Sequence, residues 1–381
     1  MLKFTKGGQK KNGWAMNILH INTEKTWRGG EQQTLYLAEG LAKRGHLSEI
    51  ACQPGRELAM RAGAKEIAVH PVTMRAEWDI AAVMRLRSII RKRSIDIVHM
   101  HTSHAHTLGV AAARLSGRAC TVVARRVDFS IHRHRLSLSG LKYRFGVDRY
   151  VAISRAIRDV LVGDGIAKDR IEVVHSGIDL SRFEGIDGSH LRKELGLEPD
   201  TPIVGTVAHF AWHKGLEFLV DAAPLVAHAL PGTKIVIVGE GCLEDKIKER
   251  AREKGAAEHI LFTGFRPDVP EFLDLFDLFV MPSLMEGLCT SILDALASNN
   301  PVVASRAGGI PEIIEHEKTG LLVPPGCGKE LAAAIIRILK NHDLGQELAA
   351  RGFEKVHREF SIDAMVEGNI GVYEKLLAVN P

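Results

Sequence analysis

Short runs of β-branched and apolar residues alternate with amphipathic helical patterns along almost the whole chain. Between the first two apolar runs, a helical pattern places Leu35, Ala38 and Leu41 on one face and ends at Gly45. This alternation is typical of parallel sheets built from βαβ units, so we expect an α/β fold. The strands predicted in the first half are 17–22, 95–101, 120–126, 149–154 and 171–177.

A polar stretch that contains proline, GLEPDTP at 196–202, interrupts the pattern and predicts a linker. The chain of 381 residues exceeds the length at which a single core usually divides, so we expect two doubly wound domains in series. After Gly328 the pattern is helical, with a break at Phe360 before a last helix at about 361–378. The strands predicted after the linker are 202–207, 234–241, 260–264, 278–283, 301–306 and 320–325.

The composition favours a soluble enzyme in a reducing, cytoplasmic compartment. Charged residues make up 25% of the chain, and its five cysteines are scattered without a C-x-x-C pair, which argues against a disulfide framework or a zinc site. No apolar run approaches the roughly 20 residues that span a bilayer. The basic opening, residues 1–15, lacks an apolar signal core and is expected to be a disordered leader before Met16.

Positive charge is concentrated in one part of the first half. Between Arg85 and Arg149 there are 14 lysines and arginines against three acidic residues. This imbalance predicts an anionic partner such as a membrane surface or a phosphorylated glycolipid, and the amphipathic stretch 129–146 would suit a membrane surface. A solvated face without a partner is the alternative. Nucleic acid is disfavoured because no known binding module accompanies the charge.

Two loops after strands of the second half have features of phosphate sites. Lys214 stands at the start of a predicted helix, where free backbone N–H groups already favour an anion, and His209 is a candidate second donor. The alternative is that Lys214 is an ordinary surface lysine. The glycine-rich segment 238–245 lacks the full G-x-G-x-x-G spacing and is interpreted as a tight turn that lets backbone approach a ligand.

The segment 281–305 places a predicted helix start between two acidic residues. Thr290 and Ser291 lie in the first turn, where backbone N–H groups can hold phosphate oxygens. Asp294 shares a helix face with Thr290, and Glu286 precedes the helix, so both carboxylates are placed to accept from sugar hydroxyls. A nucleotide-sugar site follows from this reasoning. The alternative is that Thr290 only caps the helix and both acids are solvated.

The first strand–helix connection, 21–35, contains a glycine pair, Gly29–Gly30, directly before a helix. Such a pair permits close approach by a ligand or another domain, and the neighbouring contact candidates are Trp27, Arg28 and Glu31. An ordinary flexible loop is the alternative.

Several of these segments together resemble the family 4 retaining glycosyltransferases, which have the GT-B fold. The resemblance covers nearly all of 16–381 and is carried by RGGEQQTLYLAEGLAKRGH, AISRAIRDVL, GTVAHFAWHKG and MEGLCTSILDALASNNPVVAS. It implies two Rossmann-like domains facing a cleft, with the C-terminal helix packing back on the N-terminal domain. The implied acceptor domain is 16–195 plus 361–381, and the implied donor domain is 200–360.

The resemblance implies transfer of a sugar from a UDP-, GDP- or ADP-linked donor to a hydroxyl of a glycan or glycolipid, as in lipopolysaccharide or cell-envelope biosynthesis. Retention, no cofactor, no divalent metal, and a location in the cytoplasm or at the inner face of the membrane are implied with it. Lys214 and His209 would hold the diphosphate, and Glu286 would bind the donor sugar. The remaining implied donor contacts are the backbone of Gly287, Leu288, Cys289, Thr290 and Ser291, Asp294 at the ribose, Phe265 and Arg266 at the base, and Gly29 and Gly30.

The chain departs from the family pattern at three places. Asp294 stands where the family usually has glutamate, and His209 stands where it has arginine. A histidine that often follows the strand 120–126 is replaced by ARRVDF, which leaves Arg126 and Asp128 as acceptor-side candidates beside Arg28 and Glu31. Two alternatives stay open: a nucleotide-sugar epimerase of the same fold, and a nucleotide-sugar-binding protein with weak catalysis.

Overall fold

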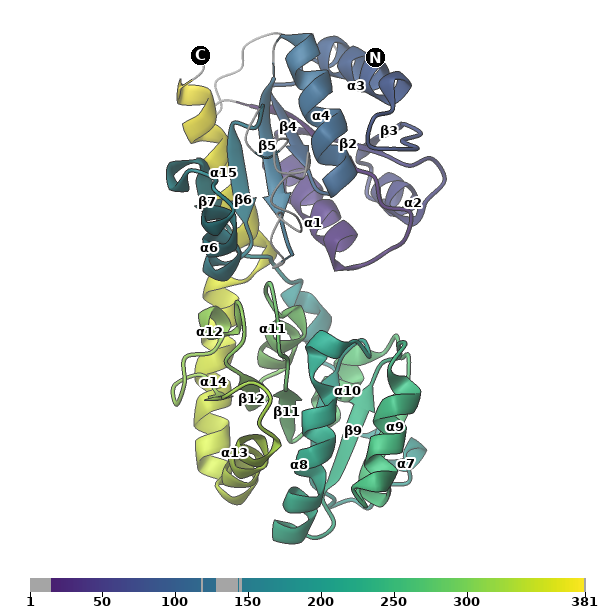
Figure 1. Cartoon of the computed structure of the whole chain (residues 1–381), viewed down its shortest axis with the longest axis vertical. Coiled ribbons are helices and arrows are strands. Elements are labelled where there is room, and N and C mark those ends of the chain that lie inside the picture. The colour runs from purple at the N-terminus through teal and green to yellow at the C-terminus, as the bar shows by residue number, and fades with distance from the viewer. Residues whose placement is uncertain (1–14, 118, 128–142, 144–145, 380–381) are drawn as a thin grey trace. The chain divides into compact units, whose positions relative to one another are not determined.

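The computed structural model describes residues 15–117, 119–127, 143 and 146–379. The chain forms two compact units (Figure 1). The first unit contains the residues up to Gly177 together with those from Ile362 onward, and the second unit is Ile178–Ser361. Each unit holds one parallel sheet with helices packed against it, so the predicted pair of α/β domains is confirmed. The predicted leader, 1–15, lies outside the described residues except for Ala15.

The first unit has a seven-stranded sheet in the order β3-β2-β1-β4-β5-β6-β7, and every pair is parallel. Its strands are β1 Asn17–Asn22, β2 Leu47–Cys52, β3 Ala68–Pro71, β4 Ile97–Met100, β5 Cys120–Arg125, β6 Arg149–Ala152 and β7 Ile171–Val173. Its helices are α1 Gly29–Lys43, α2 Glu57–Ala64, α3 Ile80–Lys92, α4 Ser103–Ser116, α6 Arg155–Gly163, the short η1 Lys168–Arg170 and α15 Ile362–Val379.

Strands β2 and β3, with helices α2 and α3, are additional to the elements predicted between 17–22 and 95–101. Ser48 and Glu49 interrupt the apolar run of β2, yet both are buried. Glu49 accepts from His70 Nε2 at 2.7 Å and is paired with Arg93, so its charge is compensated by residues distant in sequence. Strand β3 is a partly exposed edge strand that ends in Pro71, and it therefore lacks a buried apolar pattern.

The last helix, α15, packs against α1 in the first unit, as the sequence predicted (Figure 1). Val366, Tyr373 and Leu37 belong to one buried cluster. A Cβ at Gly40 would lie 2.4 Å from Val366 Cγ2, so the glycine permits the close approach of the two helices. The predicted break is also confirmed, because the preceding helix ends before the fully buried Phe360.

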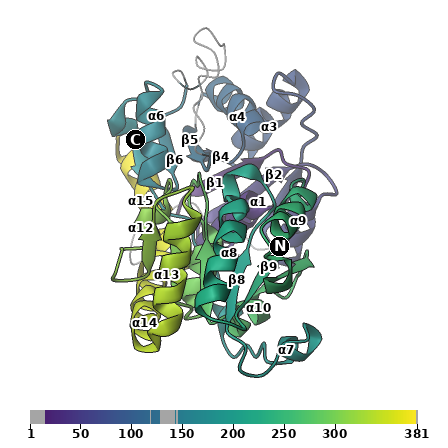
Figure 2. The same ribbon diagram turned by 60° about the horizontal axis from the view of Figure 1, so that its bottom comes forward.

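The second unit has a six-stranded parallel sheet in the order β10-β9-β8-β11-β12-β13. Its strands are β8 Ile203–Val207, β9 Lys234–Val238, β10 Ile260–Gly264, β11 Leu278–Met281, β12 Val302–Ser305 and β13 Leu321–Val323. Its helices are η2 Leu180–Phe183, α7 His190–Glu194, η3 Trp212–Lys214, α8 Leu216–Ala229, α9 Glu244–Glu253, η4 Ala257–His259, α10 Val269–Leu275, α11 Thr290–Ala297, α12 Ile310–Ile313, α13 Gly328–Lys340 and α14 His342–Glu359. Helices α8 and α13 pack side by side (Figure 2).

The division between the units lies earlier than the boundary at 195–200 that the linker predicted. The segment after Gly177 packs on α10 of the second unit. Gly188 N donates to Asp274 Oδ2 at 2.8 Å, and a Cβ at Gly188 would lie 2.0 Å from the carbonyl oxygen of Glu271. Such contacts depend on tertiary packing, so the composition of the linker does not reveal them. Among the described residues, no helix combines the length and apolar character needed to cross a membrane.

Candidate functional site

Lys214 and Glu286 meet in the second unit, although 72 positions separate them. Lys214 is the last residue of η3 and lies just before α8, and Glu286 follows β11 in the loop before α11. Lys214 Nζ donates to Glu286 Oε1 at 2.6 Å, and both side chains are largely buried. The structure therefore brings the predicted phosphate ligand and the predicted sugar-hydroxyl ligand into one place, beyond the carboxyl ends of β8 and β11.

The loop that carries Glu286 is held in place by several close contacts. Ser283 Oγ donates to Glu286 Oε1 at 2.8 Å, and Gly309 N donates to the backbone oxygen of Glu286 at 3.0 Å. Gly308 has a φ of +50°, and a Cβ there would lie 1.8 Å from the same oxygen. Only glycine fits this approach without moving the loop. Ser283 and Gly308 are positioning residues that the sequence analysis did not identify.

Helix α11 begins at Thr290, and its N-cap residue is Cys289. The Cys289 side chain makes no capping hydrogen bond, and burial raises the pKa of its thiol to about 12. Thr290 is thus the first helical residue and not the cap. A helix start without a side-chain cap keeps the donor character that favours an anion. Gly287 and Leu288 lead directly into this turn, as their predicted backbone role requires.

Asp294 lies on α11, four residues after Thr290. Burial raises the pKa of its carboxyl to about 6, and the nearby Arg182 of η2 opposes this shift. Among the described residues, no side chain or backbone group is hydrogen-bonded to this carboxylate. Asp294 is half-buried, and its carboxylate has little contact with water and no protein donor in the described part of the chain. Such a carboxylate is suited to accept from the hydroxyls of a ligand.

His209 follows β8 and is exposed. The glycine-rich turn after β9 packs against the same loop: a Cβ at Gly239 would lie 2.0 Å from Ala208 O, and one at Gly241 would lie 2.7 Å from Phe210 N. Both glycines have positive φ. The close approach of the chain's own backbone is therefore one reason for these two glycines, and the approach of a ligand to this turn stays a prediction.

Phe265 and Arg266 lie between β10 and α10. The ring of Phe265 is 68% exposed and is free to stack against a flat group. Arg266 donates to Asp268 Oδ1 from Nε at 2.9 Å, is also paired with Glu194, and lies over the ring of Phe272. These contacts raise the pKa of Arg266 above its ordinary value. Of the two predicted base contacts, Phe265 is the more accessible.

The glycine pair of the first unit opens α1. A Cβ at Gly29 or Gly30 would meet nothing within 4 Å. The chain's own packing therefore does not require glycine here, which leaves ligand access as a reason for the pair. Arg28 precedes the helix, and its backbone N–H donates to Glu31 Oε2 at 3.1 Å. Asn22 Nδ2 donates to Glu31 Oε1 at 3.2 Å, so the carboxylate of Glu31 stabilises the helix start.

Arg126 follows β5 and ends a chain of hydrogen bonds that the sequence analysis missed. Its Nη2 donates to His101 Nδ1 at 3.2 Å, and His101 Nε2 lies 3.0 Å from His20 Nδ1. His20 Nε2 lies 3.2 Å from Ser48 Oγ. The histidines after β4, in HMHTSHAH, were the available signal in the sequence. Asp128, the other candidate beside Arg126, lies outside the described residues.

His20, His99 and His101 also place ring nitrogens within 4.8 Å of one another, as a metal site would. Burial lowers the pKa of all three, so they are neutral. Since arginine only donates, His101 Nδ1 accepts, and its Nε2–H then donates to His20 Nδ1. Two of the three candidate ligand nitrogens are therefore used within the protein, and the positive Arg126 adjoins them. This donor set fits a divalent metal poorly.

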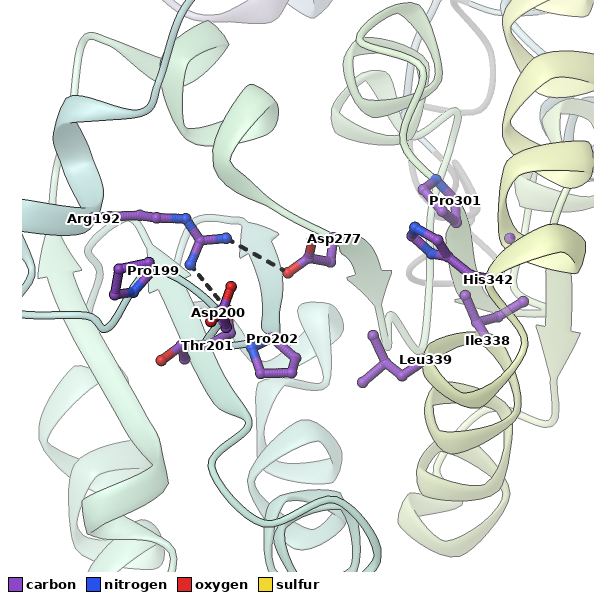
Figure 3. A pocket seen from close by; sticks show the side chains of 11 residues that line it. Arg192, Pro199, Asp200, Thr201, Pro202, Asp277, Pro301, Ile338, Leu339 and His342 are labelled. Carbon is purple, nitrogen blue, oxygen red and sulfur yellow. Dashed lines mark hydrogen bonds and ion pairs between the residues drawn. The ribbon is translucent and has the colours of Figure 1, made fainter.

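A pocket of about 350 Å³ lies at the amino ends of strands in the second sheet (Figure 3). It is lined by residues that precede β8, β11 and β12, including Pro202, Asp277 and Pro301. Arg192 and Asp277 approach to 4.0 Å there. Ligands of open α/β sheets bind beyond the carboxyl ends of the strands, so we do not assign the predicted site to this pocket.

Both halves of the chain match family models. The model described as "Glycosyltransferase Family 4" matches residues 27–182, and the model described as "Glycosyl transferases group 1" matches residues 188–355. N-acetyl-alpha-D-glucosaminyl L-malate synthase of Bacillus anthracis is 25% identical over 90% of this chain and 92% of that protein. The lipopolysaccharide core biosynthesis glycosyltransferase LpsE of Rhizobium meliloti is 26% identical over 96% of this chain and 100% of its own length.

A third relative is the GDP-mannose-dependent alpha-(1-6)-phosphatidylinositol monomannoside mannosyltransferase of Mycobacterium tuberculosis H37Rv. It is 28% identical over 91% of this chain and 95% of its own length. Among solved structures, Anabaena Alr3699/HepE in complex with UDP has a TM-score of 0.82 at 21% identity, covering 94% of this chain and 100% of that one. This likeness supports the two-domain fold at the level of architecture.

Proposed function

Because the chain belongs to the glycosyltransferases described by these two family models, with the GT-B fold, we propose that it moves a sugar from a nucleotide-diphosphate sugar to a hydroxyl of a glycan or glycolipid acceptor. The proposal includes retention at the anomeric carbon and catalysis without a divalent metal. The observation that supports it most strongly is the contact of Lys214 with Glu286 beside the start of α11.

In the proposed reaction, the bond between the anomeric carbon and the leaving phosphate oxygen breaks, and negative charge grows on the diphosphate. The oxygen of the acceptor hydroxyl forms the new bond to the same face of that carbon, and its proton passes to the departing diphosphate. Lys214 and the first turn of α11 supply positive potential where this charge develops. Glu286 holds Lys214 and accepts from hydroxyls of the donor sugar. Asp294 accepts from the ribose, and Phe265 stacks against the base. His209 adds a donor to the diphosphate.

The proposed acceptor is a lipid-linked or cell-envelope glycan. Two of the relatives carry names that refer to lipopolysaccharide core and to a phosphatidylinositol mannoside, which supports an acceptor of this class. Another relative is named N-acetyl-alpha-D-glucosaminyl L-malate synthase, which keeps a small acceptor as an alternative. We place the reaction at the cytoplasmic face of the membrane, where nucleotide sugars and lipid-linked acceptors meet.

A surface of the first unit suits contact with an anionic membrane. Trp78, Ile80 and Met84 are 77%, 78% and 48% exposed, which is unusual for large apolar side chains. Ile80 and Met84 share one face of α3 with Arg91, because they are spaced by four and seven residues. Apolar side chains beside arginine are typical of helices that lie in a membrane interface. The basic stretch 129–146, proposed for the same role, lies outside the described residues except for Tyr143 and Gly146.

The proposal is tested by incubating the protein with a panel of UDP-, GDP- and ADP-sugars, with and without extracted envelope glycolipids. We expect one donor to yield a glycosylated lipid and free nucleoside diphosphate, in the presence of EDTA, with an anomer of unchanged configuration by NMR. Interconversion of the donor without acceptor would indicate an epimerase instead. Donor binding without any turnover across the panel would indicate a binding protein.

Membrane contact is tested by sedimentation with vesicles at low and high salt. We expect the protein to bind phosphatidylglycerol vesicles at low salt and to bind neutral phosphatidylcholine vesicles far less. Replacing Ile80 and Met84 together by serine should reduce binding. Unchanged binding by that variant would remove this surface from the proposal.

A further inference from the structure

The first unit contains a small cavity of its own. It is bordered by β4, β5, β6, the segment after β7, α1 and α15, and its volume is about 20 Å³. A space of this size holds one guest comparable to a water molecule or a halide ion. The polar side chains that line it include Arg126, His99 and Asn369.

The polar groups at this cavity are not satisfied by the protein. Arg126 Nε and Nη1, His99 Nε2 and Asn369 Oδ1 are buried and have no hydrogen-bond partner within the described part of the chain. A buried donor without a partner costs about 1–3 kcal/mol, and more when it is charged. Several such groups on residues that line one cavity call for a guest that satisfies them.

The charge of Arg126 is only partly compensated, by Glu31, which is not in direct contact with it. Its guanidinium is hydrogen-bonded to the neutral His101, and no ion pair with a carboxylate is found for it among the described residues. Glu31 attracts it electrostatically, but both oxygens of Glu31 already accept hydrogen bonds at the start of α1. Burial lowers the pKa of Arg126 only to about 10, so the group stays positive at neutral pH. Water would satisfy hydrogen bonds here but not the charge.

The contact between His99 and Tyr373 bears on which ring nitrogen of His99 carries the proton. His99 Nδ1 lies 2.6 Å from the hydroxyl of Tyr373, and burial raises the pKa of this hydroxyl, so it remains protonated. When Tyr373 donates to Nδ1, the proton of neutral His99 is on Nε2, and His99 offers an N–H donor at the cavity in addition to Arg126.

We propose that this cavity binds a small monovalent anion of the chloride class, held by the guanidinium of Arg126 and by His99 Nε2. The anion neutralises the guanidinium and fixes the end of the hydrogen-bond chain that runs through His101 and His20 to Ser48. It binds within the first unit and takes no part in donor binding. Asn369 Oδ1 is an acceptor without a partner among the described residues, and Ser176 also lines the cavity, so water bound in place of the anion is the competing outcome.

Two measurements on the full chain test this site. In crystals grown with sodium bromide, we expect an anomalous bromine signal in the cavity. In solution, the unfolding temperature should be several degrees higher in sodium chloride than in sodium gluconate at equal ionic strength, because gluconate is too large for the cavity. Water alone in the cavity, or bromide in the crystal without any difference in solution (an adventitious ion only), would overturn the proposal.

Variants make the test specific. Asn369→Asp places a carboxylate at the cavity, so the variant should be more stable than the parent in gluconate and should lose its response to chloride. Arg126→Gln should lose the response as well. Asn341→Asp, at the exposed start of α14, is the matched control and should keep the response. A chloride response that persists in Asn369→Asp would contradict the assignment, even if Arg126→Gln fails to fold.

Discussion

Replacing Asp294 by asparagine should stabilise the protein while weakening its affinity for the donor. Burial raises the pKa of this carboxyl from 3.8 to about 6. In free energy, this corresponds to a cost of about 3 kcal/mol for keeping the carboxyl charged in the folded protein. Since the side chain is partly exposed, we expect a gain of about 2 kcal/mol from Asp294→Asn at pH 8. For a domain of this size, this corresponds to a rise in Tm of about 4–8 °C.

The sign of the pH dependence follows from the raised pKa. Between pH 3.8 and about 6 the folded protein binds the proton that the unfolded chain has released, so this group destabilises the fold increasingly as pH rises. The penalty is complete above about pH 6 and roughly half as large at pH 5. The gain from Asp294→Asn, measured by urea or thermal unfolding, should therefore be larger at pH 8 than at pH 5.

Donor affinity should change in the opposite direction. Loss of a charged acceptor for the ribose hydroxyls costs about 1.5–3 kcal/mol, so calorimetry should show nucleoside diphosphate binding about 10- to 150-fold weaker. The parent should also lose affinity as pH falls through about 6, and the variant should not. Asp343→Asn, at an exposed position on α14, is the control and should change neither quantity appreciably. A destabilised Asp294→Asn variant, or one with unchanged affinity, would refute this reasoning.

Three further predictions concern the same site and its surroundings. Lys214→Ala should lower kcat/KM at least about 100-fold and destabilise the fold, because it leaves Glu286 without its ion-pair partner. Adding Glu286→Gln should restore stability without activity. Near-normal turnover of the single variant would argue against the diphosphate role. Cys289 is buried and its thiol pKa is raised to about 12, so it should resist maleimide in the native protein while the exposed Cys242 reacts. Mass spectrometry can measure the labelling of each cysteine. Rapid labelling of Cys289 would mean that the start of α11 opens. Gly30→Ala should fold normally, because a Cβ meets nothing within 4 Å, yet transfer less sugar; full activity would exclude ligand contact at that position.

The sequence predicted most of the fold because buried parallel strands have apolar runs that are visible locally. All six strands of the second sheet and the break at Phe360 were predicted from such runs. Strand β2 was missed because Glu49 looks like a surface residue, and only its pairing with His70 and Arg93 makes its burial acceptable. Pairing of this kind depends on residues 21 and 44 positions away, which no local pattern contains.

The candidate site was predicted at the level of residue types and not of contacts. The helix start and the lysine indicated where an anion would bind, but the direct contact of Lys214 with Glu286 required the folded sheet. The same holds for the carboxyl of Asp294, whose raised pKa comes from burial. The hydrogen-bond chain that ends at Arg126 joins strands β1 and β2 to the residues directly after β4 and β5, so it had no signature in any single segment.

The most direct test of the account is a crystal structure of the protein with a bound nucleoside diphosphate. The account predicts pyrophosphate density against the first turn of α11, with an oxygen within hydrogen-bond distance of Lys214 Nζ and the ribose hydroxyls at Asp294. Nucleotide bound elsewhere, for example in the pocket beside Arg192 at the amino ends of the strands, would contradict it.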